Sequence, residues 1–196
     1  MCNRYRNQTS TAEMAEALDA VVAKDFAWKA DIYPRYEAPV VISHEGTRRI
    51  GPMKWGFPME VEGKTKMLTK HVTNARHLDS PFWKPSLEHV SRRCLVPFTS
   101  FAEPKPGKDE EGHPAQYWFR VTDQKIACFA GLWRHSEEGA VFAFATTEPN
   151  PLIAPLHPKA MPVILLPEDQ EKWLTGNYED ILKLQAPYPS QMMSVE

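Results

Sequence analysis

The sequence lacks the long apolar run that a membrane helix needs, and its first residues lack the apolar segment of a secretory signal. A membrane helix needs about 20 consecutive apolar residues, and a signal peptide needs a central apolar stretch of about 7 to 15. We therefore expect no membrane partner and a cytoplasmic location. In that reducing compartment cysteines stay thiols.

Cysteine is also scarce. Cys2, Cys94 and Cys128 form no Cys-x-x-Cys pair, and no Cys/His ligand spacing recurs. Structural zinc sites depend on such spacing, and an odd count leaves at least one cysteine outside any disulfide. The sequence therefore predicts no metal site and no cofactor.

An excess of positive charge is missing as well, since 25 acidic residues outnumber 23 basic ones and the net charge is −2. A globally basic nucleic-acid binder is excluded, and any DNA site must be a local patch. Internal repeats and low-complexity linkers are also absent. We expect a monomer with one domain over residues 1–186 and a short, loosely attached tail over residues 187–196.

Proline is abundant, with 18 residues among 196, and this favours short elements and many turns. A capping box at residues 10–13 predicts a helix over residues 10–23, Pro167 suits the first turn of a second helix, and Asn177 can cap a third. The polar segments 60–70 and 104–114 indicate loops. Apolar or alternating runs predict strands near residues 38–43, 48–55, 94–97, 117–121, 126–132, 141–146 and 161–166. The fold class is α+β, a mainly antiparallel, barrel-like sheet with a few peripheral helices.

Cys2 directly follows the initiator methionine. Aminopeptidases remove Met1 when the next side chain is small, which would leave Cys2 with a free α-amine and a thiol on neighbouring carbons. Such an aminothiol condenses with an aldehyde to an imine and then closes a thiazolidine ring through sulfur. The α-amine and the thiol have ordinary pKa values of about 8 and 8.5, so each has some nucleophilic form near neutral pH.

Four other side chains are candidates for chemistry. Glu103 lies in an apolar Phe-Ala-Glu-Pro segment, which raises the pKa of a carboxyl and suits it to acid–base catalysis. His157 precedes an apolar strand, and Asn74 and Arg76 lie two residues apart. Each also has a purely structural interpretation, as a turn cap, a surface ion pair, a strand end or a loop histidine, and taken singly that interpretation is the stronger one.

Taken together, these residues stand in eight short motifs whose order resembles the SOS response-associated peptidase (SRAP) family of abasic-site-shielding proteins. The resemblance runs from Met1 to about Leu174. The motifs are Met1-Cys2-Asn3-Arg4-Tyr5, Trp55-Gly56-Phe57-Pro58, Asn74-Ala75-Arg76, Arg92-Arg93-Cys94-Leu95-Val96-Pro97, Phe101-Ala102-Glu103, Ala130-Gly131-Leu132-Trp133, Thr146-Thr147, and His157 leading to Met161-Pro162.

The resemblance implies that Met1 is removed, by self-processing peptidase activity or otherwise, and that Cys2 then cross-links to the aldehyde of an abasic site in single-stranded DNA. The cross-link would shield the lesion in the DNA damage response. By resemblance, Asn74 holds the N-terminal residue and Glu103 manages protons during imine formation and ring closure. His157 would assist opening of the sugar ring and the reverse reaction.

The same resemblance implies a DNA-binding set. Arg4 and Arg76 match phosphate-binding arginines, and Pro34 matches a proline that lines the DNA groove. Lys159 is the nearest basic substitute for a family arginine, because the usual His-x-Arg-Met-Pro is one residue longer here. Phosphate contacts position a strand and carry no sequence information.

This sequence also departs from the family. Asn3 replaces the usual glycine after the cysteine, Ala102 and Pro104 replace the usual aromatic neighbours of the glutamate, and residues 60–70 contain no aromatic side chain for base stacking.

Two other functions therefore stay open. Cys2, His157 and Asn74 could form a cysteine hydrolase that acts in trans, or the protein could be a non-catalytic single-stranded DNA-binding module.

Overall fold

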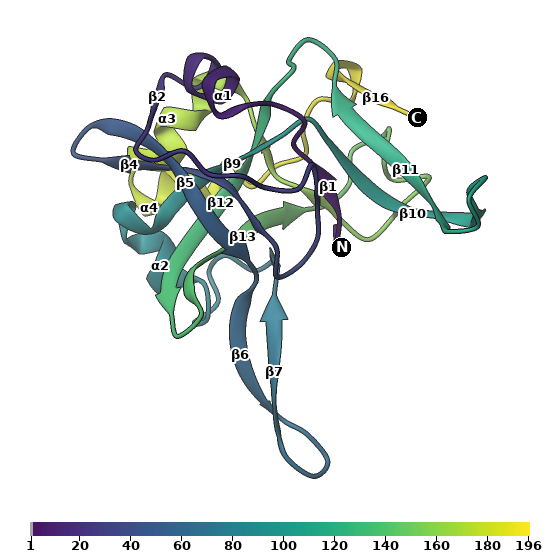
Figure 1. Cartoon of the computed structure of the whole chain (residues 1–196), viewed down its shortest axis with the longest axis horizontal. Coiled ribbons are helices and arrows are strands. Elements are labelled where there is room, and N and C mark those ends of the chain that lie inside the picture. Colours follow the sequence, from purple (N-terminus) through teal and green to yellow (C-terminus); the bar gives the residue numbers. More distant parts are fainter. Residues whose placement is uncertain (1) are drawn as a thin grey trace.

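The computed structural model describes residues 2–196, so Met1, whose removal is expected, lies outside the described residues. Five strands form a closed barrel at the centre of the molecule (Figure 1). In order around the barrel they are β13 (Gly139–Thr147), β12 (Ala127–Ser136), β9 (Arg93–Phe98), β4 (Glu37–His44) and β5 (Thr47–Trp55). Neighbours along this order are antiparallel, and a parallel pairing of β13 with β5 closes the ring. The predicted fold class is confirmed.

A second sheet contains the start of the chain. Its order is β16 (Met193–Val195), β11 (Pro114–Val121), β10 (Ser100–Lys108), β1 (Tyr5–Arg6) and β3 (Asp31–Ile32), with every pairing antiparallel. Although β1 has only two residues, it is hydrogen-bonded on both sides, to β10 and to β3. Tyr5 and Arg6 are therefore fixed within a sheet.

Shorter strands extend the barrel, and a hairpin projects from it. β2 (Ala20–Val22) and β8 (Asn74–Ala75) run parallel to β5 and β13, while β14 (Met161–Pro162) and β15 (Ile164–Leu165) pair with β13 and β12. β6 (Phe57–Glu62) and β7 (Met67–Val72) form the projecting hairpin (Figure 1). The loop expected over residues 60–70 is therefore wrong, because most of that segment belongs to paired strands.

The helices lie on one side of the barrel, away from β10 and β11 (Figure 1). They are α1 (Thr11–Ala17), α2 (Lys84–Glu88), α3 (Pro167–Thr175) and α4 (Tyr178–Leu182), with 3-10 turns at Val90–Arg92 and Ser190–Met192. The capping box at Ser10, the first-turn Pro167 and the Asn177 cap are all confirmed. No helix within residues 2–196 is long and apolar enough to cross a membrane.

The helix expected over residues 10–23 is too long. It ends at Ala17, and Asp19 then takes a left-handed backbone conformation with φ of 47°. Val21 and Val22 follow in β2, where their β-branched side chains suit a strand better than a helix. Pairing with β5 thus overrides the continuation of the helical pattern.

Two further expectations need correction. The loop predicted over residues 104–114 is narrower, because β10 continues to Lys108 and β11 begins at Pro114. The tail is not loosely attached, since β16 pairs with β11 and the side chains of Tyr188 and Met193 are buried. The boundary at residue 186 stays a prediction.

The apolar core has two parts. One contains side chains from the barrel strands and from the second sheet, and in it Tyr5 packs edge-on against Trp55, Phe129 and Phe144. The other contains the buried apolar side chains of all four helices. Edge-to-face aromatic pairs add about 0.5–1.5 kcal/mol beyond their burial, so the first part fixes Tyr5, and with it the residues just before it.

Candidate active site at the start of the chain

Cys2 is buried just ahead of β1, with 1% of its surface exposed. Its Sγ donates a hydrogen bond to the backbone oxygen of Arg4 at 3.4 Å. Burial raises the pKa of the Cys2 thiol far above its ordinary value, and the negative charge of Glu103 raises it further. Cys2 therefore carries a neutral thiol near pH 7.

Asn74 holds the backbone of Cys2. Its Nδ2 donates to the carbonyl oxygen of Cys2 at 3.0 Å and to Oγ1 of Thr73 at 2.7 Å. Asn74 reaches this place because β8 pairs with β13, with Asn74 opposite Phe144. The Oδ1 atom of Asn74 is buried and accepts no hydrogen bond from residues 2–196. An unused acceptor therefore faces the interior beside the start of the chain.

Glu103 reaches the site from β10. Pairing of β1 with β10 sets Tyr5 opposite Phe101, and this antiparallel register brings the residues before β1 alongside Glu103. The carboxyl of Glu103 is fully buried, and its Oε2 lies 3.5 Å from Nδ1 of His157. Burial raises the pKa of Glu103 to about 7. The expectation of a raised pKa is confirmed.

His157 ends a turn that Asn150 organises. Oδ1 of Asn150 accepts from the backbone N–H groups of Leu152 and Ile153, and the N–H of His157 donates to the carbonyl of Ile153. Burial lowers the pKa of His157, and the positive charge of Lys159 lowers it further. The imidazole is therefore neutral near pH 7 and can accept or pass on a proton.

A groove of about 1220 Å³ opens beside this cluster, and we call it the reactive groove. Its lining includes Asn3, Arg4, Pro34, Thr73 and Ala102. Two of the predicted DNA-binding residues, Arg4 and Pro34, therefore share one open surface next to Cys2.

The other two predicted DNA-binding residues lie outside the lining of the reactive groove. Arg76 directly follows β8, and its backbone oxygen accepts from Nε2 of Gln185. Its Nη1 is buried without a hydrogen-bond partner among residues 2–196. Lys159 is exposed and close enough to His157 to influence the imidazole.

Several neighbours of the site were not expected from the sequence. They are Arg6, Asp31, Thr73 and Trp118, and Trp118 lies opposite Ala102 in the pairing of β10 with β11. Glu103 itself lies opposite Tyr117 in the same pairing, so the aromatic residue beside Glu103 comes from the neighbouring strand.

The hydrogen-bond pattern differs from that of a cysteine peptidase. In such a triad the amide orients the histidine, whereas here Asn74 binds the Cys2 carbonyl and His157 approaches Glu103. Within residues 2–196 no three His, Cys, Asp or Glu side chains are grouped so as to hold a metal ion.

These features define a class of protein. It is a β-barrel with a buried cysteine at the start of the chain, an asparagine side chain that binds the carbonyl of that cysteine, and a carboxylate–imidazole pair beside it. The family model described as "SOS response associated peptidase (SRAP)" matches residues 1–196. The chain belongs to this family.

The similar proteins agree with this membership. The chain is 28% identical to the abasic site processing protein YoqW of Bacillus subtilis (strain 168), over 98% of this chain and 90% of that protein. It is 27% identical to the abasic site processing protein YoaM of the same organism, over 89% of this chain and 79% of that protein.

Crystal structures of two bacterial proteins share the fold. One, from Bordetella bronchiseptica, gives a TM-score of 0.77 at 20% identity, covering 99% of this chain and 98% of that chain. The other, from Bacteroides thetaiotaomicron, also gives 0.77 at 20% identity, covering 99% and 90%. At this identity the likeness concerns the fold alone.

Proposed function

We propose that this protein processes abasic sites in single-stranded DNA by forming a thiazolidine between Cys2 and the aldehyde of the ring-opened sugar, after Met1 has been removed. The observation that carries the proposal is the Glu103–His157 pair, 3.5 Å apart, beside a buried cysteine at the start of the chain. Family membership and the names of the similar proteins support it.

The first covalent step joins nitrogen to carbon. The α-ammonium of Cys2 gives a proton to the Glu103 carboxylate, and the free amine attacks the aldehyde carbon to form a carbinolamine. Protonation of the carbinolamine oxygen then releases one water, and loss of the remaining N–H proton leaves an imine. A carboxyl with a pKa of about 7 can both accept the first proton and return it near neutral pH.

The second step joins sulfur to the same carbon. The Cys2 thiol adds across the C=N bond, its proton passes to the nitrogen, and the five-membered ring closes. Because the raised pKa keeps the Cys2 thiol neutral, the sulfur must lose its proton as it attacks, and the imine nitrogen takes up that proton. Overall one water is lost for each cross-link, and no oxidant or reductant is required.

Asn74 and His157 would prepare these steps. Asn74 fixes the Cys2 carbonyl at 3.0 Å, and its unused Oδ1 can accept a hydrogen bond from the new α-amine. The neutral imidazole of His157 can relay protons between Glu103 and the sugar oxygen, which must gain a proton when the ring opens.

The peptidase activity would prepare the protein itself. Hydrolysis of the Met1–Cys2 peptide bond consumes one water, releases methionine and leaves the α-amine on Cys2. The acid–base pair needed for this reaction, Glu103 and His157, already lies beside Cys2.

We assign strand binding to four residues. Arg4 and Pro34 line the reactive groove beside Cys2, Arg76 follows the strand that holds Asn74, and Lys159 lies near His157. Arginine and lysine contact phosphates regardless of base, so the protein would accept any sequence around the lesion.

The test incubates Met-free protein with single-stranded DNA that carries one abasic site, and looks for a shifted band on a denaturing gel. Intact mass first establishes that Met1 is gone. We expect a covalent band with the wild-type protein and no band with Cys2→Ala. Cys128→Ala is the control, because Cys128 is a buried cysteine of the core, and this variant should give the wild-type band.

Other results would favour another function. Absence of a covalent band with the Met-free wild-type protein, or an undiminished band with Cys2→Ala, would refute the cross-link. Turnover of a peptide without DNA would indicate a hydrolase acting in trans. Salt-sensitive DNA binding that survives Cys2→Ala, without any cross-link, would indicate a non-catalytic binding module.

A further inference from the structure

Two arginines converge on one oxygen atom at the edge of the reactive groove. Nη2 and Nε of Arg4 donate to Oδ1 of Asp31 at 2.6 and 2.9 Å, and Nε of Arg6 donates to the same oxygen at 3.1 Å. The pairing of β1 with β3, in which Arg6 lies opposite Asp31, brings the three side chains together. All three remain partly exposed, so a ligand can reach them.

An indole ring completes the cluster. The guanidinium carbon of Arg6 lies 3.7 Å from the ring centroid of Trp118, and that of Arg4 lies 4.9 Å from it. Guanidinium groups held against an aromatic face lose less freedom when they bind an anion. Two such groups directed at a single oxygen atom form the donor arrangement that binds a phosphate.

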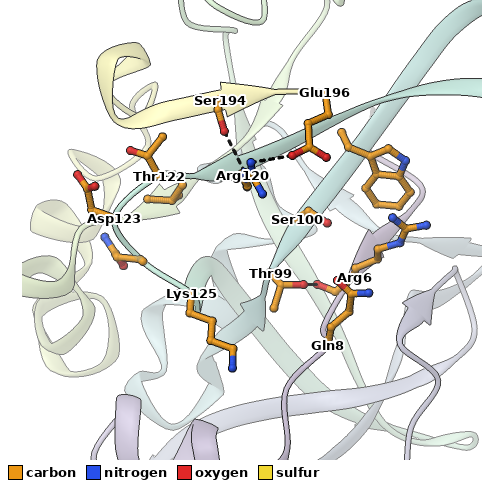
Figure 2. A pocket seen from close by; sticks show the side chains of 13 residues that line it. Arg6, Gln8, Thr99, Ser100, Arg120, Thr122, Asp123, Lys125, Ser194 and Glu196 are labelled. Atoms are coloured by element: carbon orange, nitrogen blue, oxygen red, sulfur yellow. Dashed lines mark hydrogen bonds and ion pairs between the residues drawn. The ribbon is translucent and has the colours of Figure 1, made fainter.

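The cluster separates two cavities. Arg6 and Trp118 line both the reactive groove and a second cavity of about 830 Å³, which Figure 2 shows from close by. In this second cavity Arg120 binds Ser194 and Glu196, and Lys125 lies below the turn that carries Asp123. Its charged lining side chains are three basic and two acidic, with hydroxyl groups from Thr99, Ser100, Thr122 and Ser194 between them.

We propose that Arg4, Arg6 and Trp118 form a phosphate-binding site that Asp31 occupies in the free protein, and that a DNA strand displaces the Asp31 carboxylate on its way from the reactive groove into the second cavity. The proposal rests on the proposed function only in taking single-stranded DNA as the ligand. Arg6 becomes a strand-binding residue, and the second cavity carries the part of the strand beyond the lesion.

In this proposal the Asp31 carboxylate competes with the DNA phosphate for Arg4 and Arg6. Its carboxylate satisfies both guanidinium groups when no DNA is present, so a phosphate gains only the difference between the two sets of contacts. Undamaged strands, which cannot form the cross-link, would be held weakly and released. A strand with an abasic site would be retained by the covalent bond.

The test measures equilibrium binding without cross-linking. In a Cys2→Ala background, fluorescence anisotropy of a labelled, undamaged single strand is recorded between about 50 and 200 mM salt. We expect Asp31→Asn to tighten binding about fivefold at the lower salt concentration. Adding Arg6→Ala to that variant should remove the gain and reduce the slope of log K against log salt by about 0.7, the value for one phosphate contact on a single strand.

Matched controls separate a specific site from a change of net charge. Glu179→Gln removes an exposed acid on α4, on the side of the molecule away from β10 and β11, and Arg49→Ala removes an exposed base on β5. Both should leave the affinity nearly unchanged. Asp31→Glu keeps the carboxylate and should bind like the parent, and thermal melting verifies that each variant is folded.

The proposal is overturned if Asp31→Asn binds no more tightly than the parent, if Glu179→Gln produces the same gain, or if Arg6→Ala has no effect in the Asp31→Asn background. Its failure is distinguishable from that of the proposed function. Loss of cross-linking to abasic DNA, with the Asp31 effect intact, would refute only the thiazolidine chemistry. Normal cross-linking without an Asp31 effect would refute only the phosphate site.

Discussion

At the scale of single residues, burial changes the acidity of Cys2 and Glu103 in the same direction. Both groups have raised pKa values because the interior penalises their charged forms. For the thiol this means a neutral group at any physiological pH. For the carboxyl it means a group that exchanges its proton near pH 7, which the amine chemistry requires.

The pH dependence of cross-linking should report on Glu103. Below pH 7 its carboxyl is protonated and cannot accept the amine's proton, so the rate should rise as the pH increases through about 7. Glu103→Gln should lower the rate about 100-fold and lose this rise, keeping only the later rise of the amine itself near pH 8. Single-turnover cross-linking over a pH series measures both effects.

The control for that experiment is Glu179→Gln, which removes an exposed carboxylate on α4, on the side of the molecule away from β10 and β11. It should keep the wild-type rate and profile. An unchanged pH profile in Glu103→Gln would assign the proton transfer to another group.

The sequence predicted some site residues and missed others for a physical reason. Cys2, Asn74, Glu103 and His157 each stand in a short motif, and the structure brings them together. Asp31 and Trp118 stand in no such motif. They reach the site only through strand pairing, with Asp31 opposite Arg6 and Trp118 opposite Ala102, and local sequence does not encode which strands become neighbours.

At the scale of elements, the pattern of apolar residues along each strand determined whether that strand could be predicted from the sequence. The barrel strands are buried and rich in apolar or β-branched residues, so their positions could be predicted well. The hairpin strand β7 is exposed over Met67 to Lys70, and it shows no alternation between an apolar and a polar face. A strand without a buried face looks like a loop in the sequence, which explains the wrong expectation for residues 60–70.

Strand β16 was also not expected from the sequence, and its contribution to stability can be measured. Met193 lies opposite Val121 of β11 and is buried in the core, so Met193→Ala should lower the free energy of unfolding by about 2 kcal/mol or more. Met67→Ala removes the same side chain from the hairpin, where 57% of it is exposed, and should cost about 0.5 kcal/mol or less.

Urea denaturation of both methionine variants gives the comparison. Equal and small losses would contradict the packing of β16 against the rest of the fold. A large loss for Met193→Ala alone would establish that the segment after residue 186 belongs to the folded unit.

At the scale of the whole molecule, Gly131 lies where β9, β12 and α3 meet. Nε1 of Trp173 donates to the backbone oxygens of Cys94 and Gly131 at 3.1 and 2.9 Å. A Cβ on Gly131 would lie 2.6 Å from Sγ of Cys94 and 2.8 Å from Cγ2 of Val96. The barrel therefore needs a residue without a side chain at this position.

Gly131→Ala should accordingly destabilise the protein by about 1–3 kcal/mol through overpacking. Gly51 offers the matched control, because it also lies in a barrel strand but has no atom within 4 Å of an added Cβ. Gly51→Ala should leave stability unchanged or raise it by about 0.5 kcal/mol. A comparison of urea midpoints measures both, and similar losses in the two variants would contradict the packing argument.

The assembly of the site from distant segments has a consequence for the newly made chain. Cys2 leaves the ribosome first, while Asn74, Glu103 and His157 follow later, the last of them 155 residues after Cys2. At synthesis rates of about 5–20 residues per second, His157 emerges roughly 8–30 s after Cys2. The complete site cannot form before His157 has emerged, so during that interval the N-terminus is accessible to a ribosome-bound aminopeptidase.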